Sequence, residues 1–167
     1  MKKIFTKKDM IKLQDLLRKH KKTITTAESC TGGLVASMIT KISGSSDIFN
    51  GAIVSYSNEV KHQELRVSSN ILEKYGAVSK EVVHQMLNGA LKKFNASFAI
   101  AISGVAGPKG GTKNKPVGTV IIGIANNLGA KKIKRFYFTG TRVEIQKKSA
   151  QTSLREILKF AQKTLDN

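Results

Sequence analysis

Apolar residues recur at helical spacing along much of the chain. Met10, Leu13 and Leu17 repeat every three or four positions, which predicts an amphipathic helix over residues 6–19 that begins at Thr6. The same spacing, or a capping residue followed by apolar positions, predicts further helices. They cover residues 34–42, 58–65, 69–75, 79–94 and 142–165, with caps or stops at Gly44, Asn58, Ser68 or Ser69, Ser79 and Asn95.

Short β-rich runs lie between these helices. Residues 23–27 and 51–57 are strand-like, and residues 98–102 are apolar without alternation, which is typical of a central strand covered on both faces. Two further strands, 117–125 and 131–138, are joined by a turn with hairpin chemistry and are expected to be antiparallel. The order of elements predicts a single-domain three-layer α/β/α sandwich over residues 1–167, with a mixed, mostly parallel sheet.

Composition favours an ordinary globular protein. The 167 residues are 40% hydrophobic and 24% charged, which suits one domain with its own core. No apolar run approaches the roughly 20 residues that cross a bilayer, so we expect a cytoplasmic protein without a membrane span. A single cysteine, Cys30, excludes an intrachain disulfide and a cysteine-rich zinc cage.

The formal net charge of +18 raises the question of nucleic acid. The basic residues are spread along the chain, aromatic residues make up only 6%, and no recognition-helix or zinc-finger motif is present. We therefore interpret the charge as a solvated basic surface and expect no nucleic-acid partner. A basic nucleic-acid-binding or partner-binding module without catalysis remains the alternative at this point.

Three loops follow the predicted strands where an open α/β sheet binds ligands: 28–33, 55–61 and 103–116. In the first loop Ser29 lies at a strand-to-helix turn, where the next backbone N–H groups are expected to be free to bind an anion or an oxyanion. Gly32 and Gly33 leave that approach open. A serine at this place is also typical of a simple helix cap.

The second loop carries Tyr56 and Lys61. A lysine that is buried away from water can lose its proton and act as a base for a hydroxyl group. Lowering its pKa from about 10.4 to about 7.5 costs roughly 4 kcal/mol, which requires real burial. A solvated helix lysine is the alternative.

The third loop is rich in glycine but has neither a Walker ending nor a dinucleotide fingerprint. Backbone donors could wrap a ligand there, and a merely flexible loop is the alternative. Arg142, at the start of the last helix, is suited to hold a phosphate or lies on the surface. His20, His62 and His84 are far apart without ligand spacing, so the sequence predicts no metal site.

Six blocks in order resemble the CinA C-terminal domain family, and together they are a specific match that extends to the flanking helices. The blocks are Ala27–Gly33 (AESCTGG), Gly44–Ser46 (GSS), Val54–Lys61 (VSYSNEVK), Gly76–Ser79 (GAVS), Ser103–Pro108 (SGVAGP) and Lys115–Val120 (KPVGTV). The resemblance implies a nicotinamide-nucleotide amidohydrolase, which converts nicotinamide mononucleotide and water to nicotinate mononucleotide and ammonia in the recycling of NAD. It also implies the stand-alone form, no cofactor and a homo-oligomer.

The resemblance also implies roles for individual residues. Ser29 would be the nucleophile, with Tyr56 and Lys61 moving protons. The substrate would be bound by Thr31, Gly32, Gly33, Ser103, Gly104, Gly107 and Arg142. One position departs from the family: where relatives often have a second arginine, this chain has Gln146, so the implied phosphate clamp is incomplete.

Overall fold

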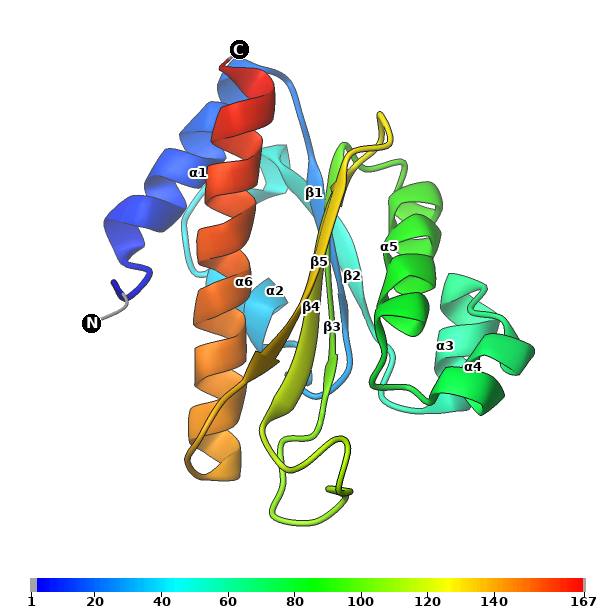
Figure 1. The fold of residues 1–167 in the computed structure, drawn as a ribbon. Coiled ribbons are helices and arrows are strands. Elements are labelled where there is room, and N and C mark those ends of the chain that lie inside the picture. The colour runs from blue at the N-terminus through cyan, green and yellow to red at the C-terminus, as the bar shows by residue number, and fades with distance from the viewer. Residues whose placement is uncertain (1–2, 167) are drawn as a thin grey trace.

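The computed structural model, which describes residues 3–166, has one five-stranded sheet between two layers of helices (Figure 1). This is the predicted single-domain α/β/α sandwich. The terminal residues of the predicted domain, 1–2 and 167, lie outside the described part of the chain.

The sheet is mixed, as the sequence predicts. Its strands are β1 (Ile24–Glu28), β2 (Phe49–Val54), β3 (Phe98–Gly104), β4 (Thr119–Asn126) and β5 (Lys131–Tyr137). The spatial order is β2-β1-β3-β4-β5. Strands β2, β1 and β3 run parallel to one another, whereas β4 runs antiparallel to β3 and to β5. The parallel strands therefore all end at the same edge of the sheet, where the loops that follow β1, β2 and β3 meet.

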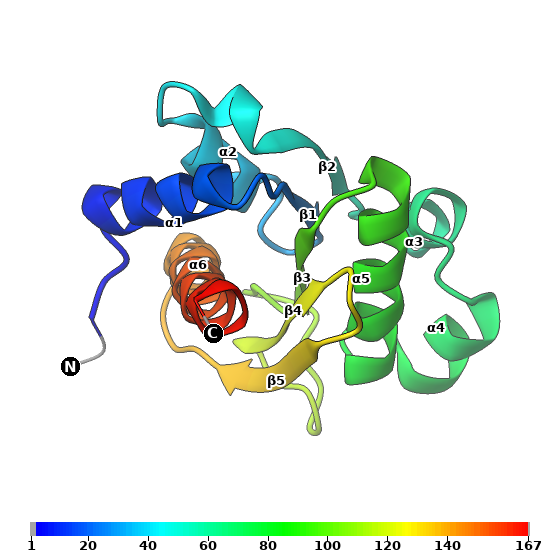
Figure 2. The ribbon, with the colours of Figure 1, turned by 90° about the horizontal axis from the view of Figure 1, so that it is seen from above.

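Helices cover both faces of the sheet (Figures 1 and 2). One layer contains α1 (Lys7–Lys19), α2 (Leu34–Thr40) and α6 (Arg142–Leu165). On the other face α5 (Lys80–Phe94) packs against the strands, and α3 (Asn58–Leu65) and α4 (Ser69–Tyr75) pack against α5. Because β3 and β4 are covered on both sides, nearly all of their residues are buried, which explains why their sequences are mostly apolar without alternation.

Most helix ends lie at the predicted capping residues. Thr6 forms a reciprocal capping box with Asp9, Ser68 and Ser79 accept backbone N–H groups at the starts of α4 and α5, and Asn95 ends α5 with φ 47°. Such side chains satisfy N–H groups that have no partner within the helix.

Two predicted caps are wrong. Ser57, not Asn58, caps α3, because its hydroxyl accepts the N–H of Val60 and Asn58 is already helical. Gly44 does not end α2, which stops at Thr40. Gly44 instead has φ 83° and precedes a short 3-10 turn, Ser45–Asp47.

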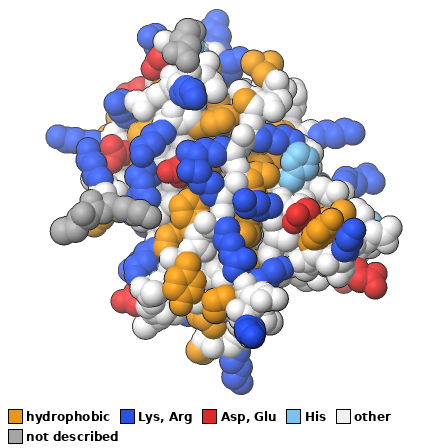
Figure 3. Space-filling model, in the orientation of Figure 1, with side chains coloured by type: hydrophobic (Ala, Val, Ile, Leu, Met, Phe, Trp, Pro, Cys, Tyr) orange, Lys and Arg blue, Asp and Glu red, His pale blue; other side chains and the backbone are white. Residues whose placement is uncertain are grey.

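The chain is strongly basic, with a formal net charge of +18. Figure 3 shows lysine and arginine side chains scattered over the face that carries α6 and β5, with apolar and neutral atoms between them. Among the described helices, none is both long and apolar enough to span a membrane.

Candidate active site

A cavity of about 320 Å³ opens beyond the ends of β1, β2 and β3. It is lined by residues from all three predicted loops and from the start of α6. The predicted site residues among them are Ser29, Tyr56, Lys61, Ser103, Gly104, Gly107 and Arg142. Residues far apart in the sequence therefore share one cavity, because parallel strands end together at this edge.

Ser29 and Lys61 are in direct contact in this cavity. The Lys61 ammonium donates a hydrogen bond of 3.0 Å to Ser29 Oγ and a second one of 2.8 Å to the Ser55 carbonyl. Ser29 is held at the end of β1, where its N–H donates to the Ile102 carbonyl of β3. The serine hydroxyl and the lysine amine are thus positioned for proton transfer.

Lys61 is buried although it carries an amine. Its side chain is 1% exposed, and none of the ion pairs in residues 3–166 includes it. Burial lowers the pKa of Lys61 below its ordinary value, because water no longer stabilises the ammonium form. The interpretation of Lys61 as a solvated helix residue is therefore wrong.

Glu28, immediately before Ser29, holds the strand-to-helix turn in place. This fully buried carboxylate accepts hydrogen bonds from the hydroxyls of Thr26 and Thr31 at 3.0 and 2.8 Å. It also accepts the N–H groups of Val35 and Ala36 at 2.9 and 3.0 Å. A carboxylate at the positive end of a helix satisfies donors that would otherwise lack partners.

The expectation that the N–H groups after Ser29 are free is therefore wrong for four of them. Those of Val35 and Ala36 bind Glu28, and those of Gly32 and Leu34 donate to the Ser29 and Thr31 carbonyls, both at 3.0 Å. Thr31, Gly32 and Gly33 do not line the cavity. Gly32 and Gly33 have φ of 59° and 100°. Glycine adopts this left-handed backbone conformation without steric cost, so these two residues suit the turn.

Tyr56 lies at the rim of the cavity, and its hydroxyl is hydrogen-bonded to Arg142 rather than to Ser29 or Lys61. Its side chain is 60% exposed, and its hydroxyl accepts a hydrogen bond of 2.6 Å from Arg142. Arg142 also donates to the Gly107 carbonyl at 2.6 Å. The arginine therefore connects the loop after β2 with the loop after β3 across the mouth of the cavity.

The loop after β3 forms another wall. The Ser103 hydroxyl donates to the Ala77 carbonyl at 2.8 Å, which ties this loop to the segment before α5. A Cβ at Gly104 would lie 2.9 Å from the Thr119 carbonyl oxygen, and one at Gly107 would lie 2.5 Å from Val117, so both positions require glycine. These contacts hold the loop after β3 in place as a wall of the cavity.

Several residues that line the cavity, or that bind residues lining it, carried no strong signal in the sequence. The Ser55 carbonyl binds Lys61, and Gln146 donates to the Cys30 carbonyl at 3.0 Å. Asn58 and Lys109 also line the cavity. A backbone carbonyl that accepts a hydrogen bond, or a contact between residues more than a hundred positions apart, leaves no periodic pattern in the sequence. Ser55 and Asn58 do fall within the Val54–Lys61 block that carries part of the family resemblance.

Cys30 also faces the cavity, but its thiol is a poor nucleophile. Its side chain is 5% exposed, and burial raises the pKa of the thiol to about 12. The reactive form of cysteine is the thiolate, which such a pKa suppresses at neutral pH. Ser29 is therefore the better candidate nucleophile.

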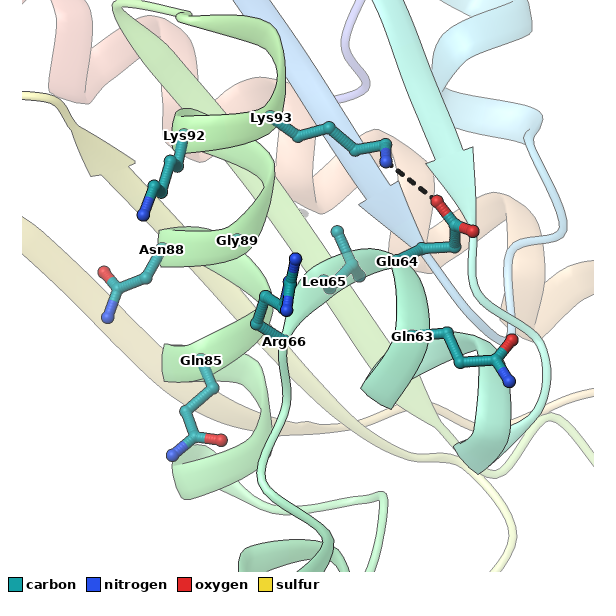
Figure 4. Close-up of a pocket in the computed structure, with 9 residues that line it drawn as sticks. All are labelled: Gln63, Glu64, Leu65, Arg66, Gln85, Asn88, Gly89, Lys92 and Lys93. Carbon is teal, nitrogen blue, oxygen red and sulfur yellow. Dashed lines mark hydrogen bonds and ion pairs between the residues drawn. The ribbon is translucent and has the colours of Figure 1, made fainter.

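A larger hollow of about 600 Å³ lies between α3 and α5, away from Ser29 (Figure 4). Amide and basic side chains line it, and Lys93 forms an ion pair of 2.8 Å with Glu64 there. No serine, cysteine, threonine or histidine lines this hollow. Within residues 3–166, no three His, Cys, Asp or Glu side chains are grouped as metal ligands.

The sequence profile of the CinA C-terminal domain matches residues 7–161. The chain belongs to the CinA C-terminal domain family. A CinA-like protein of Prochlorococcus marinus (strain MIT 9301) is 52% identical over 143 residues, and one of Thermotoga neapolitana is 44% identical over 144 residues. These matches cover 84% and 86% of this chain but 34% and 35% of the relatives, so the chain spans about a third of their length.

Solved structures of this family have the same fold. The competence/damage inducible protein CihA of Agrobacterium tumefaciens is 34% identical, with a TM-score of 0.87 over 94% of this chain and 98% of that one. The competence damage-inducible protein A (ComA) of Klebsiella pneumoniae is 31% identical, with a TM-score of 0.87 over 91% and 94%.

Proposed function

We propose that this chain is an amidohydrolase that converts nicotinamide mononucleotide to nicotinate mononucleotide and ammonia. One observation carries the proposal: a buried lysine without an acidic partner lies 3.0 Å from the hydroxyl of a serine in a cavity. A serine–lysine pair of this kind is suited to acyl transfer. The choice of substrate rests on the resemblance to the family.

The first half of the reaction forms an acyl-enzyme. Ser29 Oγ attacks the carboxamide carbon while its proton moves to the neutral amine of Lys61. The tetrahedral intermediate then collapses, the C–N bond breaks, and Lys61 gives that proton to the leaving nitrogen, so ammonia departs. The cationic pyridinium ring withdraws electrons from the carboxamide and makes its carbon easier to attack.

The second half regenerates the serine. Water attacks the ester carbon and gives a proton to Lys61, which returns it to Ser29 Oγ as the C–O bond breaks. Nicotinate mononucleotide is released as the acid, and its carboxyl proton passes to solvent or to the released ammonia, which leaves the carboxylate. The same nitrogen thus acts as base and then as acid in both halves, which requires an amine with a lowered pKa.

The oxyanion is best placed against the loop after β3. The N–H of Val105 already donates to the Thr119 carbonyl at 2.8 Å. The N–H groups of Ala106 and Gly107 are therefore our candidates for the oxyanion hole, where one donor typically contributes on the order of 100-fold or more in rate.

The rim of the cavity is suited to bind the phosphate of nicotinamide mononucleotide. Arg142 offers a planar fork at the mouth of the cavity, and Lys109 lines the same cavity. Tyr56 then orients Arg142 rather than serving as the base. A cavity of about 320 Å³ is at the lower end of the range of roughly 300–1,000 Å³ that is typical of small-molecule sites.

The direct test is a time course with nicotinamide mononucleotide in the presence of EDTA. We expect equal amounts of ammonia and nicotinate mononucleotide, and slower turnover of nicotinamide riboside, which lacks the phosphate. If no product forms when enzyme and substrate are at equal concentrations, the proposed reaction is wrong.

Replacing Cys30 with alanine tests the choice of nucleophile. The variant should release ammonia within about threefold of the wild-type rate, because the protonated thiol takes no part in the reaction. Iodoacetamide at neutral pH should leave the wild type active. Loss of activity in Cys30→Ala with an unchanged melting temperature would instead identify the thiol as the nucleophile.

A further inference from the structure

The hollow between α3 and α5 is lined mainly by side chains that donate hydrogen bonds or carry positive charge (Figure 4). Its volume of about 600 Å³ is within the range of roughly 300–1,000 Å³ that is typical of small-molecule sites. None of the residues that line it also lines the cavity of Ser29. The proposed reaction therefore gives this hollow no role.

Positive charge exceeds negative charge in the hollow. Three cations line it, Arg66, Lys92 and Lys93, against one acid, Glu64. Glu64 is paired with Lys93 at 2.8 Å. Within residues 3–166, the side chains of Arg66 and Lys92 take part in no ion pair and no hydrogen bond. Two cations in the hollow thus lack an anionic partner.

Arg66 occupies a backbone position that does not favour arginine. It ends α3 with φ 59° and ψ 28°, a left-handed conformation that glycine and asparagine adopt more easily than residues with longer side chains. Its N–H donates to the His62 carbonyl at 3.1 Å, a bond that any residue except proline can make. The arginine side chain, rather than its backbone, is therefore the part that calls for a role.

Gly89 brings the end of α3 against α5. A Cβ at this position would overlap with the Leu65 carbonyl oxygen, so glycine is required for the two helices to approach this closely. Arg66 directly follows Leu65, and its side chain lies between the two helices (Figure 4). Lys92 lies three residues after Gly89, on the same side of α5. An arginine and a lysine thus line one space from two helices.

We propose that the hollow between α3 and α5 binds a diphosphate group, free or as part of a larger metabolite, through Arg66 and Lys92. The planar guanidinium binds two phosphate oxygens side by side, and the ammonium adds a point charge. Gln85 uses its amide oxygen to accept the Ser68 N–H at 2.6 Å, so its NH₂ group is left to donate to the ligand.

The lining of the hollow favours a diphosphate over other anions. Two cations without an acidic partner are matched by a ligand with at least two negative charges, which a single carboxylate does not supply. No aromatic side chain lines the hollow, so a nucleotide base has no ring to stack on. The recognised feature is therefore the diphosphate itself.

This inference goes beyond the proposed reaction, because it predicts binding at a second place rather than turnover. Ser29→Ala, which should stop the release of ammonia, should leave diphosphate binding unchanged. The two proposals can therefore fail separately.

Isothermal titration with pyrophosphate at physiological ionic strength tests the site. The titrations are made in an Arg142→Ala background, which removes the arginine at the rim of the Ser29 cavity as a competing anion site. Arg66→Asn should weaken binding by about tenfold or more. It should not lower the melting temperature, because asparagine is well suited to the left-handed conformation. Lys92→Gln should also weaken binding and provides a second test.

The matched control is Lys21→Asn. Lys21 is an exposed lysine just after α1 with φ 52°, and it does not line the hollow. This variant removes the same charge from the same backbone conformation, so binding should be unchanged. Glu64→Gln should instead tighten binding by about threefold or more, because it removes the one acid that lines the hollow and releases Lys93.

A second probe is ADP, which carries its diphosphate within a nucleotide and should bind no more tightly than pyrophosphate. Three results would overturn the proposal. They are the absence of pyrophosphate binding, equal weakening by Arg66→Asn and Lys21→Asn, and binding of ADP without binding of pyrophosphate. Equal weakening would indicate a general attraction of anions to a chain with a net charge of +18.

Discussion

Ser29→Ala is expected to reduce the release of ammonia from nicotinamide mononucleotide by about 10³-fold or more, because it removes the atom that attacks the carboxamide. The Ser29 hydroxyl accepts a hydrogen bond of 3.0 Å from Lys61, and in residues 3–166 the other acceptor of the Lys61 amine is a backbone carbonyl, that of Ser55. Substrate binding should persist, since the proposed phosphate contacts lie at the rim. Initial rates and isothermal titration with nicotinamide mononucleotide measure the two effects separately.

The matched control is Ser37→Ala, at an exposed serine of α2. It should have the wild-type rate. A Ser29→Ala enzyme that retains a tenth or more of the wild-type rate would contradict the role of nucleophile, and direct attack by water would then be the better mechanism.

Lys61→Met is expected to abolish turnover without destabilising the fold. Methionine is nearly as long as lysine but cannot accept a proton, so the rate should fall by about 10³-fold or more. The variant no longer buries an amine without an acidic partner. We therefore expect the free energy of unfolding of the variant at neutral pH to equal the wild-type value or to exceed it by about 1 kcal/mol. The lost hydrogen bond to the Ser55 carbonyl offsets part of the stability gained by removing the buried amine.

The lowered pKa of Lys61 gives this effect a definite pH dependence. Between the folded pKa and the ordinary value of 10.5, the unfolded chain binds more protons than the folded protein, so the stability of the wild type rises with pH in that window. As pH falls through the folded pKa, this stability is lost. The stability advantage of Lys61→Met should therefore be largest at low pH and disappear as pH approaches 10.5.

The turnover of the wild type should follow the same ionisation. Its kcat/KM should rise with pH as Lys61 loses its proton, with an apparent pKa below 10.5. Lys80→Met, at an exposed lysine of α5, is the control and should keep both the rate and the pH profile. If Lys61→Met retains activity, or if the wild-type rate stays flat through this range, Lys61 is not the base.

Local chemistry made the helices and most of their ends predictable. The helix Arg142–Leu165 has the predicted bounds, and Ser79 and Asn95 lie at the ends of α5 as expected. These features depend on residues three or four positions apart. Asn58 was the wrong cap because Ser57 beside it caps equally well, and only the path of the chain out of β2 decides between them.

The site was predictable only in part. Its loops follow from the order of strands and helices, since parallel strands end at one edge. The sequence does not predict that the N–H groups of Val35 and Ala36 donate to the Glu28 carboxylate. That carboxylate lies seven and eight residues earlier, and it reaches them only because the strand and the helix fold back on each other. The contact of Tyr56 with Arg142 joins residues 86 positions apart and leaves no trace in either local pattern.

The amino-acid order alone thus determined the elements, the family and the residue types available for chemistry, because spacing and capping act within a few residues. The tertiary structure decided the lowered pKa of Lys61 and its pairing with Ser29. Both depend on desolvation and on an encounter across 32 positions, and burial by distant elements is a property of the packed molecule rather than of any segment.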